Sequence, residues 1–259
     1  MPGCKAHTAA AGHLLFTILH KIAIIVAGGS GKRAGTPIPK QFCDLDGKAV
    51  LEHSIETMHR AGAELIIVVL HSDYLEEWTE RLGRLPYNIV TVAGGATRPE
   101  SVKNALSEAQ RRGCQAERQD TVWTALEGVS PDVEYVLVHD GARPLLPLKV
   151  AEEGWRVATE HGAAVPVVMP TDSLRRITAN GSEAVARADY RCVQTPQVFR
   201  AELLMRAYDR PDTDRFTDDA SLVECIYPHI TLFDGSVENM KITNPGDLEI
   251  AAILLKHRS

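Results

Sequence analysis

A glycine-rich segment with two cations directly follows the first β-branched run of the chain. Residues 27–33 read Ala-Gly-Gly-Ser-Gly-Lys-Arg, and they come straight after the run Ile22–Ala27. Glycines let backbone N–H groups close around a phosphate, and Lys32 and Arg33 add positive charge. The spacing is neither that of a Walker A loop nor that of a dinucleotide-binding fingerprint. The segment therefore predicts an anion-binding loop, with a plain glycine-rich turn as the alternative.

Two further charged residues could contribute to binding the same phosphate, one as a cation and the other as a ligand of Mg²⁺. Lys40 lies beside a rigid proline in Pro39-Lys40-Gln41, although a lone lysine of this kind is usually solvated surface. Asp140 ends another apolar run, and a carboxylate at the end of a buried parallel strand is well placed for Mg²⁺, which typically takes one or two protein carboxylates plus substrate phosphates. The alternative is that Asp140 caps a turn or pairs with Arg143.

The segments between these residues predict the elements that position them. Short apolar runs alternate with segments of helical period from Lys21 onward, which is typical of an α/β fold with a parallel sheet and crossover helices. Strands so continuously apolar must be buried on both faces, so we expect a doubly wound, Rossmann-like, mostly parallel sheet with ligands at the strands' carboxyl ends. The expected strands are 22–27, 65–70, 89–92, 135–139 and 164–168, and the expected helices are 50–60, 74–82, 98–111 and 148–161.

The second half of the chain departs from this alternation. Residues 113–132 are polar and irregular and predict a surface insertion. Residues 171–194 predict a projecting arm, because two short extended runs, 173–177 and 184–188, flank Asn180-Gly181, a type I′ hairpin signal. We then expect helices over 201–208 and 218–225, strands over 230–233 and 239–242, and a final helix with Asn244 as N-cap, Pro245 as its first residue and Asp247 in its first turn.

Composition excludes several classes of protein. The 259 residues are 44% hydrophobic, and their net charge of -6 argues against broad binding to nucleic acid or to an anionic membrane. The five cysteines are widely spaced, which speaks against a disulfide framework or a zinc site. No apolar run approaches the roughly 18 residues of a membrane span. A signal peptide is rejected for the N-terminus, because cleavage near Ala27 would cut the glycine-rich loop. We therefore interpret residues 1–20 as a disordered or artefactual tail and residues 21–259 as a single domain, and we expect the protein in the cytoplasm.

Seven motifs, taken in order, resemble those of the 2-C-methyl-D-erythritol 4-phosphate cytidylyltransferase family, a branch of the nucleotidyltransferases that activate sugar and polyol phosphates. They are G-G-S-G-K-R at 28–33 with P-K-Q at 39–41, G-G-A-T-R-P-E-S-V at 94–102, H-D-G-A-R-P at 139–144, T-D-S at 171–173, T-P-Q at 195–197, T-D-D-A-S at 217–221 and N-M-K-I-T-N-P-G-D-L at 239–248. The resemblance covers residues 21–256. It departs at the tail, at 113–132 and at Ala96, where many relatives carry an acidic residue.

The resemblance implies a direct reaction between CTP and a polyol phosphate, with release of pyrophosphate. It assigns the triphosphate and the charge of the transition state to three cations, Arg33, Lys40 and Lys241. It assigns nucleotide binding to the loop residues Ala27, Gly28, Gly29 and Gly31 and to a base-recognition segment with Gly94, Gly95 and Ser101. Asp140 would hold Mg²⁺ and contact the polyol hydroxyls.

The acceptor phosphate falls, by the same resemblance, to Ser173, Arg187, Thr195 and Thr217. Ser173 and Arg187 lie on the expected arm, which in this family comes from the second subunit. The resemblance thus implies a homodimer in which each arm completes the partner's site. The product would be CDP-methylerythritol, an isoprenoid precursor.

Two other functions fit parts of the pattern. Ribitol or ribulose 5-phosphate could replace methylerythritol phosphate, since the CTP motifs do not separate small polyol phosphates, although the arm signature is nearer to that of the methylerythritol enzymes. A non-catalytic nucleotide sensor could use the same scaffold. The joint presence of Arg33, Lys40, Asp140 and Lys241 speaks against the sensor, because binding alone does not need charge placed for a transition state.

Overall fold

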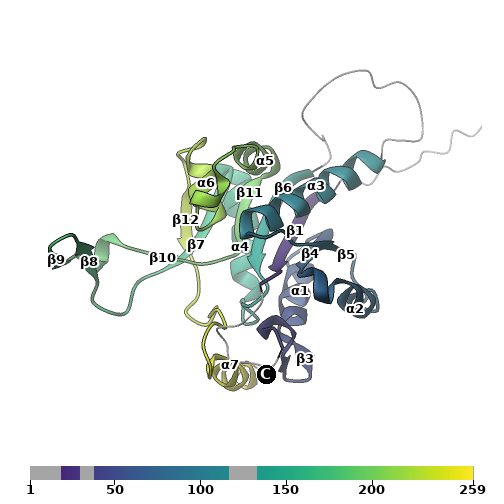
Figure 1. Cartoon of the computed structure of the whole chain (residues 1–259), viewed down its shortest axis with the longest axis horizontal. Coiled ribbons are helices and arrows are strands. Elements are labelled where there is room, and N and C mark those ends of the chain that lie inside the picture. Colours follow the sequence, from purple (N-terminus) through teal and green to yellow (C-terminus); the bar gives the residue numbers. More distant parts are fainter. Residues whose placement is uncertain (1–18, 30–37, 117–132, 259) are drawn as a thin grey trace, which may run out of the picture.

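The computed structural model describes residues 19–29, 38–116 and 133–258, which form a twisted main sheet with helices on both faces (Figure 1). The described residues give this sheet eight strands in the order β10-β7-β11-β6-β1-β4-β5, with β12 also paired to β7. The strands are β1 (Leu19–Ala27), β4 (Leu65–Leu70), β5 (Ile89–Ala93), β6 (Val133–Asp140), β7 (Ala163–Val168), β10 (Cys192–Val193), β11 (Gln197–Arg200) and β12 (Thr231–Asp234). Strands β6, β1, β4 and β5 run parallel, and β11 is antiparallel to both of its neighbours. The predicted doubly wound, mostly parallel fold is confirmed.

The central strands are buried on both faces, as their continuous apolar sequence requires. Along β1, Ala23 and Ile25 belong to one core and Ile22 and Ile24 to the other, and all four are fully buried. Successive side chains of a strand point to opposite faces, so one apolar run supplies both cores. This burial fixes the register of the sheet and therefore the place where each strand ends.

Three helices cover each face of the sheet. The first core receives α1 (Val50–Arg60), α2 (Ser72–Leu82) and α4 (Leu148–His161). The second receives α3 (Arg98–Ala116), α5 (Ala201–Tyr208) and α6 (Asp219–Glu224). The predicted boundaries of α1, α4 and α5 are confirmed to the residue, and those of α2 and α6 to within two residues. Helix α3 runs four residues into the predicted insertion, of which 117–132 lie outside the described part of the chain. The predicted tail over 1–20 is too long, because Leu19 pairs with Val133 at the start of β1; residues 1–18 lie outside the description.

The predicted strand over 239–242 is wrong. The segment is irregular, because its polar groups bond to other parts of the molecule. The amide of Asn239 donates to Thr195 O at 2.8 Å, and the backbone N–H of Ile242 donates to Ala142 O at 2.9 Å. Ile242 packs in a small third core with α7 (Asp247–Lys256). The segment thus closes over the carboxyl end of β6 instead of extending the sheet.

The predicted cap of α7 is also wrong. The helix begins at Asp247, two residues later than expected, and its N-cap is Gly246 with a φ of 90°. The Asp247 carboxylate accepts the backbone N–H groups of Thr243 and Asn244, both at 2.7 Å. Asp247 is therefore in the first turn as predicted. Its carboxylate binds the loop before the helix, where Asn244 was expected to be the N-cap and Pro245 the first helical residue.

The predicted arm is present, with a different turn. Strands β8 (Arg175–Thr178) and β9 (Gly181–Ala184) pair with Thr178 opposite Gly181, so the loop residues are Ala179 and Asn180. Neither of these two loop residues has a positive φ, which a type I′ turn needs at both; the positive φ of this hairpin, 132°, belongs to Gly181. Residues 187–189 form a 3-10 turn, η3 (Arg187–Asp189), where an extended run was expected. Figure 1 shows the β8–β9 hairpin projecting far from the sheet.

A type I′ geometry occurs elsewhere, in a hairpin absent from the sequence prediction. Strands β2 (Asp44–Leu45) and β3 (Lys48–Ala49) are joined by Asp46 and Gly47, with φ of 56° and 81°. Asp-Gly is a favoured pair for this turn because both residues tolerate positive φ. The hairpin follows the short helical turn η2 (Lys40–Phe42) and leads directly into α1, so it fixes the exit of the segment that carries Lys40.

Candidate active site

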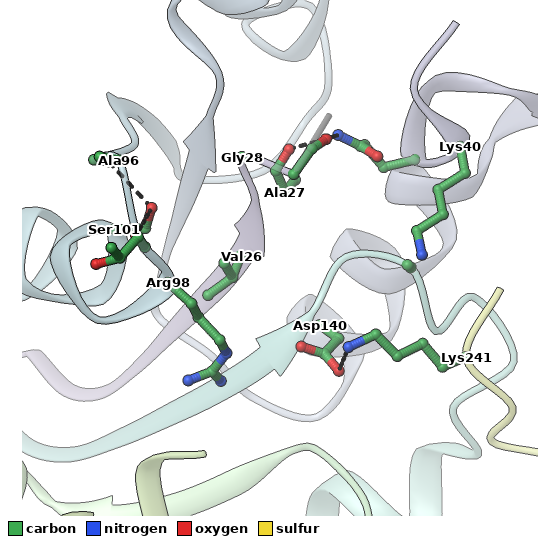
Figure 2. Close-up of a pocket in the computed structure, with 14 residues that line it drawn as sticks. Val26, Ala27, Gly28, Lys40, Ala96, Arg98, Ser101, Asp140 and Lys241 are labelled. Atoms are coloured by element: carbon green, nitrogen blue, oxygen red, sulfur yellow. Dashed lines mark hydrogen bonds and ion pairs between the residues drawn. The ribbon is translucent and has the colours of Figure 1, made fainter. Parts of the chain in front are cut away.

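A cavity of about 350 Å³ opens at the carboxyl ends of the parallel strands, where the predicted fold expects a ligand (Figure 2). It combines the start of the glycine-rich loop, the segment after β5, the end of β6 and the loop before α7. Its lining residues are Val26, Ala27, Gly28, Gly29, Lys40, Gln41, Gly95, Ala96, Thr97, Arg98, Ser101, Asp140, Ala142 and Lys241. Eight residues predicted as catalytic, nucleotide-binding or metal-binding therefore meet around one space: Ala27, Gly28, Gly29, Lys40, Gly95, Ser101, Asp140 and Lys241.

One wall of the cavity is the turn between β5 and α3. Gly94 donates its N–H to Leu70 O at 2.7 Å, and a Cβ at this position would lie 3.0 Å from Ser101 Oγ, so any side chain here would press on the Ser101 hydroxyl. The buried Ser101 hydroxyl donates to Thr97 O at 2.9 Å and accepts the N–H of Gly95 at 3.1 Å. Ser101 thus shapes the wall through internal hydrogen bonds, and its contact with a base stays a prediction.

Opposite this wall, Asp140 is surrounded by cations. Lys241 Nζ lies 2.9 Å from Asp140 Oδ2, and Arg143 Nε lies 3.3 Å from the same oxygen. Figure 2 shows the side chains of Asp140 and Lys241 pointing toward one another. Burial raises the pKa of Asp140, but the charges of Lys241, Arg98 and Arg143 outweigh it and hold the pKa well below its usual range. Asp140 is therefore ionised at neutral pH, and its pairing with Arg143, one of the two sequence-based alternatives, coexists with its place in the cavity.

Two loops are tied together by Lys40. Its ammonium group donates to the backbone carbonyl of Ile242, the residue after Lys241. Arg143 reaches the same loop and donates from Nη1 to Asn239 O at 2.7 Å. The loop that carries Lys241 is thus held from both sides by cations from other elements, which places the two lysines on one cavity although they are distant in sequence.

Arg98 is a lining residue that the sequence prediction did not single out. It forms a two-pronged ion pair with the fully buried Asp219, with distances of 3.0 Å and 2.7 Å. Tyr208 also donates its hydroxyl to Asp219, at 2.5 Å. An arginine within the T-R-P-E-S motif was the available signal, but its partner is 121 residues away and only the fold brings them together.

Thr195 lies behind Asp140 and does not line the cavity. Its hydroxyl accepts the backbone N–H of Asp140 at 3.1 Å and lies 3.0 Å from Nδ1 of His139, while Nε2 of His139 faces Arg143 O at 3.3 Å. Burial lowers the pKa of His139 to about 4, against the attraction of Asp140, so the imidazole is neutral at neutral pH. Thr195 and His139 thus hold the end of β6, and the acceptor contact of Thr195 stays a prediction.

The remaining predicted residues lie elsewhere or outside the description. Ser173 and Arg187 are exposed on the arm, where Arg187 donates to Thr171 O, and Thr217 is exposed just before α6. None of these three lines the cavity. Gly31 and Arg33 fall in 30–37, outside the described residues, so their predicted roles remain predictions.

The described part of the site offers few protein ligands to a metal ion. The described residues contain no group of three or more His, Cys, Asp or Glu side chains that could hold one. Asp140 is the sole carboxylate among the described lining residues, and it is ionised. This fits Mg²⁺ held by one carboxylate together with substrate phosphates, and it does not fit a site built from protein ligands alone.

Comparison with known proteins agrees with this geometry. The family model for IspD, 2-C-methyl-D-erythritol 4-phosphate cytidylyltransferase, matches residues 21–115 and 111–257. The chain belongs to this family. A 2-C-methyl-D-erythritol 4-phosphate cytidylyltransferase of Bacteroides thetaiotaomicron is 40% identical over 90% of this chain and 98% of its own length. A relative of the same name from Bacteroides fragilis is 39% identical over 91% and 99%. As a member of the cytidylyltransferase family, the chain is a nucleotidyltransferase.

Solved structures of the family share the fold. The 4-diphosphocytidyl-2C-methyl-D-erythritol synthase of Anaerococcus prevotii superposes with a TM-score of 0.74 at 26% identity, over 92% of this chain and 96% of that one. The 2-C-methyl-D-erythritol 4-phosphate cytidylyltransferase of Thermus thermophilus gives 0.66 at 28% identity, over 91% and 99%. Within the described part of the chain, no helix has the length and apolar character to cross a membrane.

Proposed function

We propose that the protein joins CTP and 2-C-methyl-D-erythritol 4-phosphate into CDP-methylerythritol and pyrophosphate. The observation that carries the proposal is the meeting of Lys40, Lys241 and Asp140 with the glycine-rich loop at one cavity. Relatives at 37–40% identity over nine-tenths of the chain carry the name of this activity. Among the described lining residues, none favours ribitol or ribulose 5-phosphate as the acceptor.

The chemistry needs charge placed around phosphorus more than it needs a covalent partner. A phosphate oxygen of the acceptor forms a bond to the α-phosphorus of CTP, and the bond from that phosphorus to the β-phosphate oxygen breaks, so pyrophosphate carries away the electron pair. Positioning and charge neutralisation therefore lower the barrier. Lys40 and Lys241 lie on the cavity and are suited to stabilise charge on the α-phosphoryl group and on the leaving pyrophosphate; Arg33 is proposed for the same task.

Asp140 is the residue proposed to hold Mg²⁺. When bound, the ion would neutralise the charge of the CTP phosphates. In the structure Asp140 pairs with Lys241, so a bound nucleotide would offer Lys241 a phosphate in place of the carboxylate. Asp140→Asn keeps the shape and removes the charge, so turnover and its dependence on Mg²⁺ should both collapse while the thermal unfolding transition persists. Full turnover in EDTA by the parent protein would refute the proposed metal.

The projecting arm supports a homodimer as part of this proposal. Every residue of β8 and β9 is exposed, including Ile177 at 80%. An isolated two-stranded hairpin is marginally stable in water, so it gains from packing on a partner. Ser173 and Arg187 on this arm are absent from the cavity of their own chain. We propose that they bind the acceptor phosphate in the site of the second subunit, with Thr195 and Thr217 from that subunit.

A pyrophosphate-release assay tests the substrate. The protein is given CTP, Mg²⁺ and, in separate reactions, methylerythritol 4-phosphate, ribitol 5-phosphate and ribulose 5-phosphate. Turnover with the first acceptor alone is expected. Turnover with ribitol or ribulose 5-phosphate alone would move the protein to another acceptor class, and CTP binding without turnover on any acceptor would favour a sensor. The cytoplasm is the proposed compartment.

A further inference from the structure

Gln41 joins two parts of the cavity wall through both hydrogens of its amide. The side chain is 3% exposed, and Nε2 donates to Ala27 O at 2.7 Å and to Gly29 O at 2.8 Å. A primary amide nitrogen carries two hydrogens, so these two bonds use its whole donor capacity. The acceptors are the first and third residues of the glycine-rich segment that leaves β1. Gln41 therefore ties η2 to the start of the proposed triphosphate loop.

The neighbours of Gln41 hold it rigidly in place. Phe42 stacks on Trp78 with ring centroids 4.2 Å apart and an interplanar angle of 18°, and it contacts Tyr74 at 5.0 Å. The N–H of Phe42 donates to Pro39 O at 2.8 Å, which closes the turn. Phe42 is part of the core beneath the sheet. Of the three residues of η2, Phe42 thus packs in the core, Gln41 bonds to the glycine-rich loop and Lys40 lines the cavity.

The direction of a carbonyl fixes the direction of the next N–H. In a planar trans peptide, C=O and the following N–H point in opposite directions. Since Ala27 O points at Gln41, the N–H of Gly28 points away from Gln41. Gly28 is one of the residues that line the cavity. Glycines at 28 and 29 give the backbone no steric preference of its own. An outside restraint is needed to keep these peptide planes in one orientation before a ligand arrives.

We propose that Gln41 is a positioning residue for CTP, which pre-orients the peptide planes of Ala27 to Gly29 for the nucleotide. It touches no reacting atom in this role and acts through the loop. The inference rests on the proposed CTP site. It also accounts for the Gln in P-K-Q, to which the sequence prediction gave no task.

Gln41→Met tests the proposal, because it keeps the length and burial of the side chain and removes both donors. The Kd for CTP, measured by calorimetry, should rise about 10- to 30-fold, the loss expected for roughly two hydrogen bonds. The KM for the acceptor at saturating CTP should change less than about twofold. The kcat at saturating CTP should fall much less than kcat/KM, since bound nucleotide restores the loop.

Gln197→Met is the matched control. Gln197 is equally buried, and its amide bonds to Asp218 Oδ2 and to the N–H of Ala220, both at 2.8 Å, away from the glycine-rich loop. It should lower the Tm as Gln41→Met does and leave the Kd for CTP unchanged. If Gln41→Met lowers the Tm and leaves the Kd for CTP within twofold of the parent, Gln41 is merely structural and the proposal is wrong.

A second variant covers the case in which Gln41→Met does not fold. Gln41→Asn keeps both donors and withdraws them by one methylene, so it should give a smaller rise in the Kd for CTP, and an unchanged Kd would again overturn the proposal. The parent protein separates this result from the proposed function. A parent that neither binds CTP nor releases pyrophosphate overturns the CTP site itself, whatever the variants do.

Discussion

At the scale of single residues, the described lining of the cavity holds more positive than negative charge, and Asp140, its one carboxylate, is shared between cations. Asp140 faces Lys241 and Arg143, while Lys40 bonds to a carbonyl of the loop that carries Lys241. This arrangement holds the cationic side chains near the place where the phosphate oxygens of a bound nucleotide would gain negative charge. Groups fixed in this way cost no reorganisation at the moment of reaction.

The two cavity lysines give the first prediction. Lys40→Ala and Lys241→Ala should each lower kcat by about 100-fold, because a lost electrostatic stabiliser acts mainly on the transition state. The KM for CTP should rise far less. Steady-state kinetics of pyrophosphate release measure both. Lys103→Ala, on the exposed face of α3, is the control and should match the parent. Parental kcat in both cavity variants would remove these lysines from the mechanism.

His139 gives a prediction about pH and stability. The unfolded state binds a proton on His139 below a pKa near 6.5, whereas the folded state does so only below about 4. The unfolded state therefore holds more protons between these values, so the free energy of unfolding should fall as the pH drops through this window, by up to about 3 kcal/mol. Asp140, with its lowered pKa, adds its own loss chiefly below about pH 4, the ordinary pKa of a free aspartate.

Urea unfolding at a series of pH values measures this slope. In His139→Asn, which keeps an oxygen that can accept from Thr195 but does not titrate, the slope between pH 6.5 and 4 should flatten. An equal slope in parent and variant would mean that another group titrates there.

At the scale of elements, prediction from sequence succeeds where local pattern and burial agree. The strand β4 is continuously apolar and the helices α1 and α4 have a clear helical period, and all three match their predicted bounds; β1 ends at Ala27 as predicted but begins earlier, at Leu19. The segment 239–242 has an apolar pattern that favours a strand, but the Asn239 amide is bonded to Thr195 across the molecule. A contact between such distant residues leaves no local signal, so the pattern pointed to the wrong element.

The same reason separates the predicted from the unpredicted site residues. A family resemblance can assign roles to residues that lie within its motifs. Three such residues, Lys40, Asp140 and Lys241, line the cavity. Arg98 acts through Asp219, and Gln41 through two backbone carbonyls. Only the fold brings these two residues to their partners, so the sequence shows the residue types but does not predict their roles.

The Arg98–Asp219 pair links α3 to α6 and gives a prediction about elements. Arg98→Met should destabilise the protein by about 3 kcal/mol, since it leaves a fully buried carboxylate without its counter-charge. Adding Asp219→Asn should restore part of the loss, because the buried charge is gone while Tyr208 keeps an acceptor. Denaturant unfolding of the two variants measures the coupling.

The exposed pairs on α4 provide the comparison. Arg156→Met removes ion pairs with Glu153 and Glu160 at the surface and should change stability little. Losses that simply add in Arg98→Met with Asp219→Asn would contradict the assignment of a buried, coupled pair.

At the scale of the whole molecule, the arm decides where a complete site is formed. The β8–β9 hairpin extends away from the sheet (Figure 1), and Ser173 and Arg187 on the arm do not line the cavity of their own chain. If the arm serves a partner, each groove depends on a second copy of the chain. Complementation between two defective chains tests this arrangement directly.

Mixing Arg187→Ala protomers with Lys241→Ala protomers gives the last prediction. In a mixed dimer with exchanged arms, the altered arm of one chain meets the altered groove of the other, and the second site receives an intact arm and an intact groove. With equal amounts and free exchange, half the dimers are mixed and half of their sites work, so activity should return to about one quarter of the parental value. Native mass spectrometry confirms the exchange. If exchange is complete and activity stays at the level of the separate variants, the arm serves its own chain, because every site would then keep one defect.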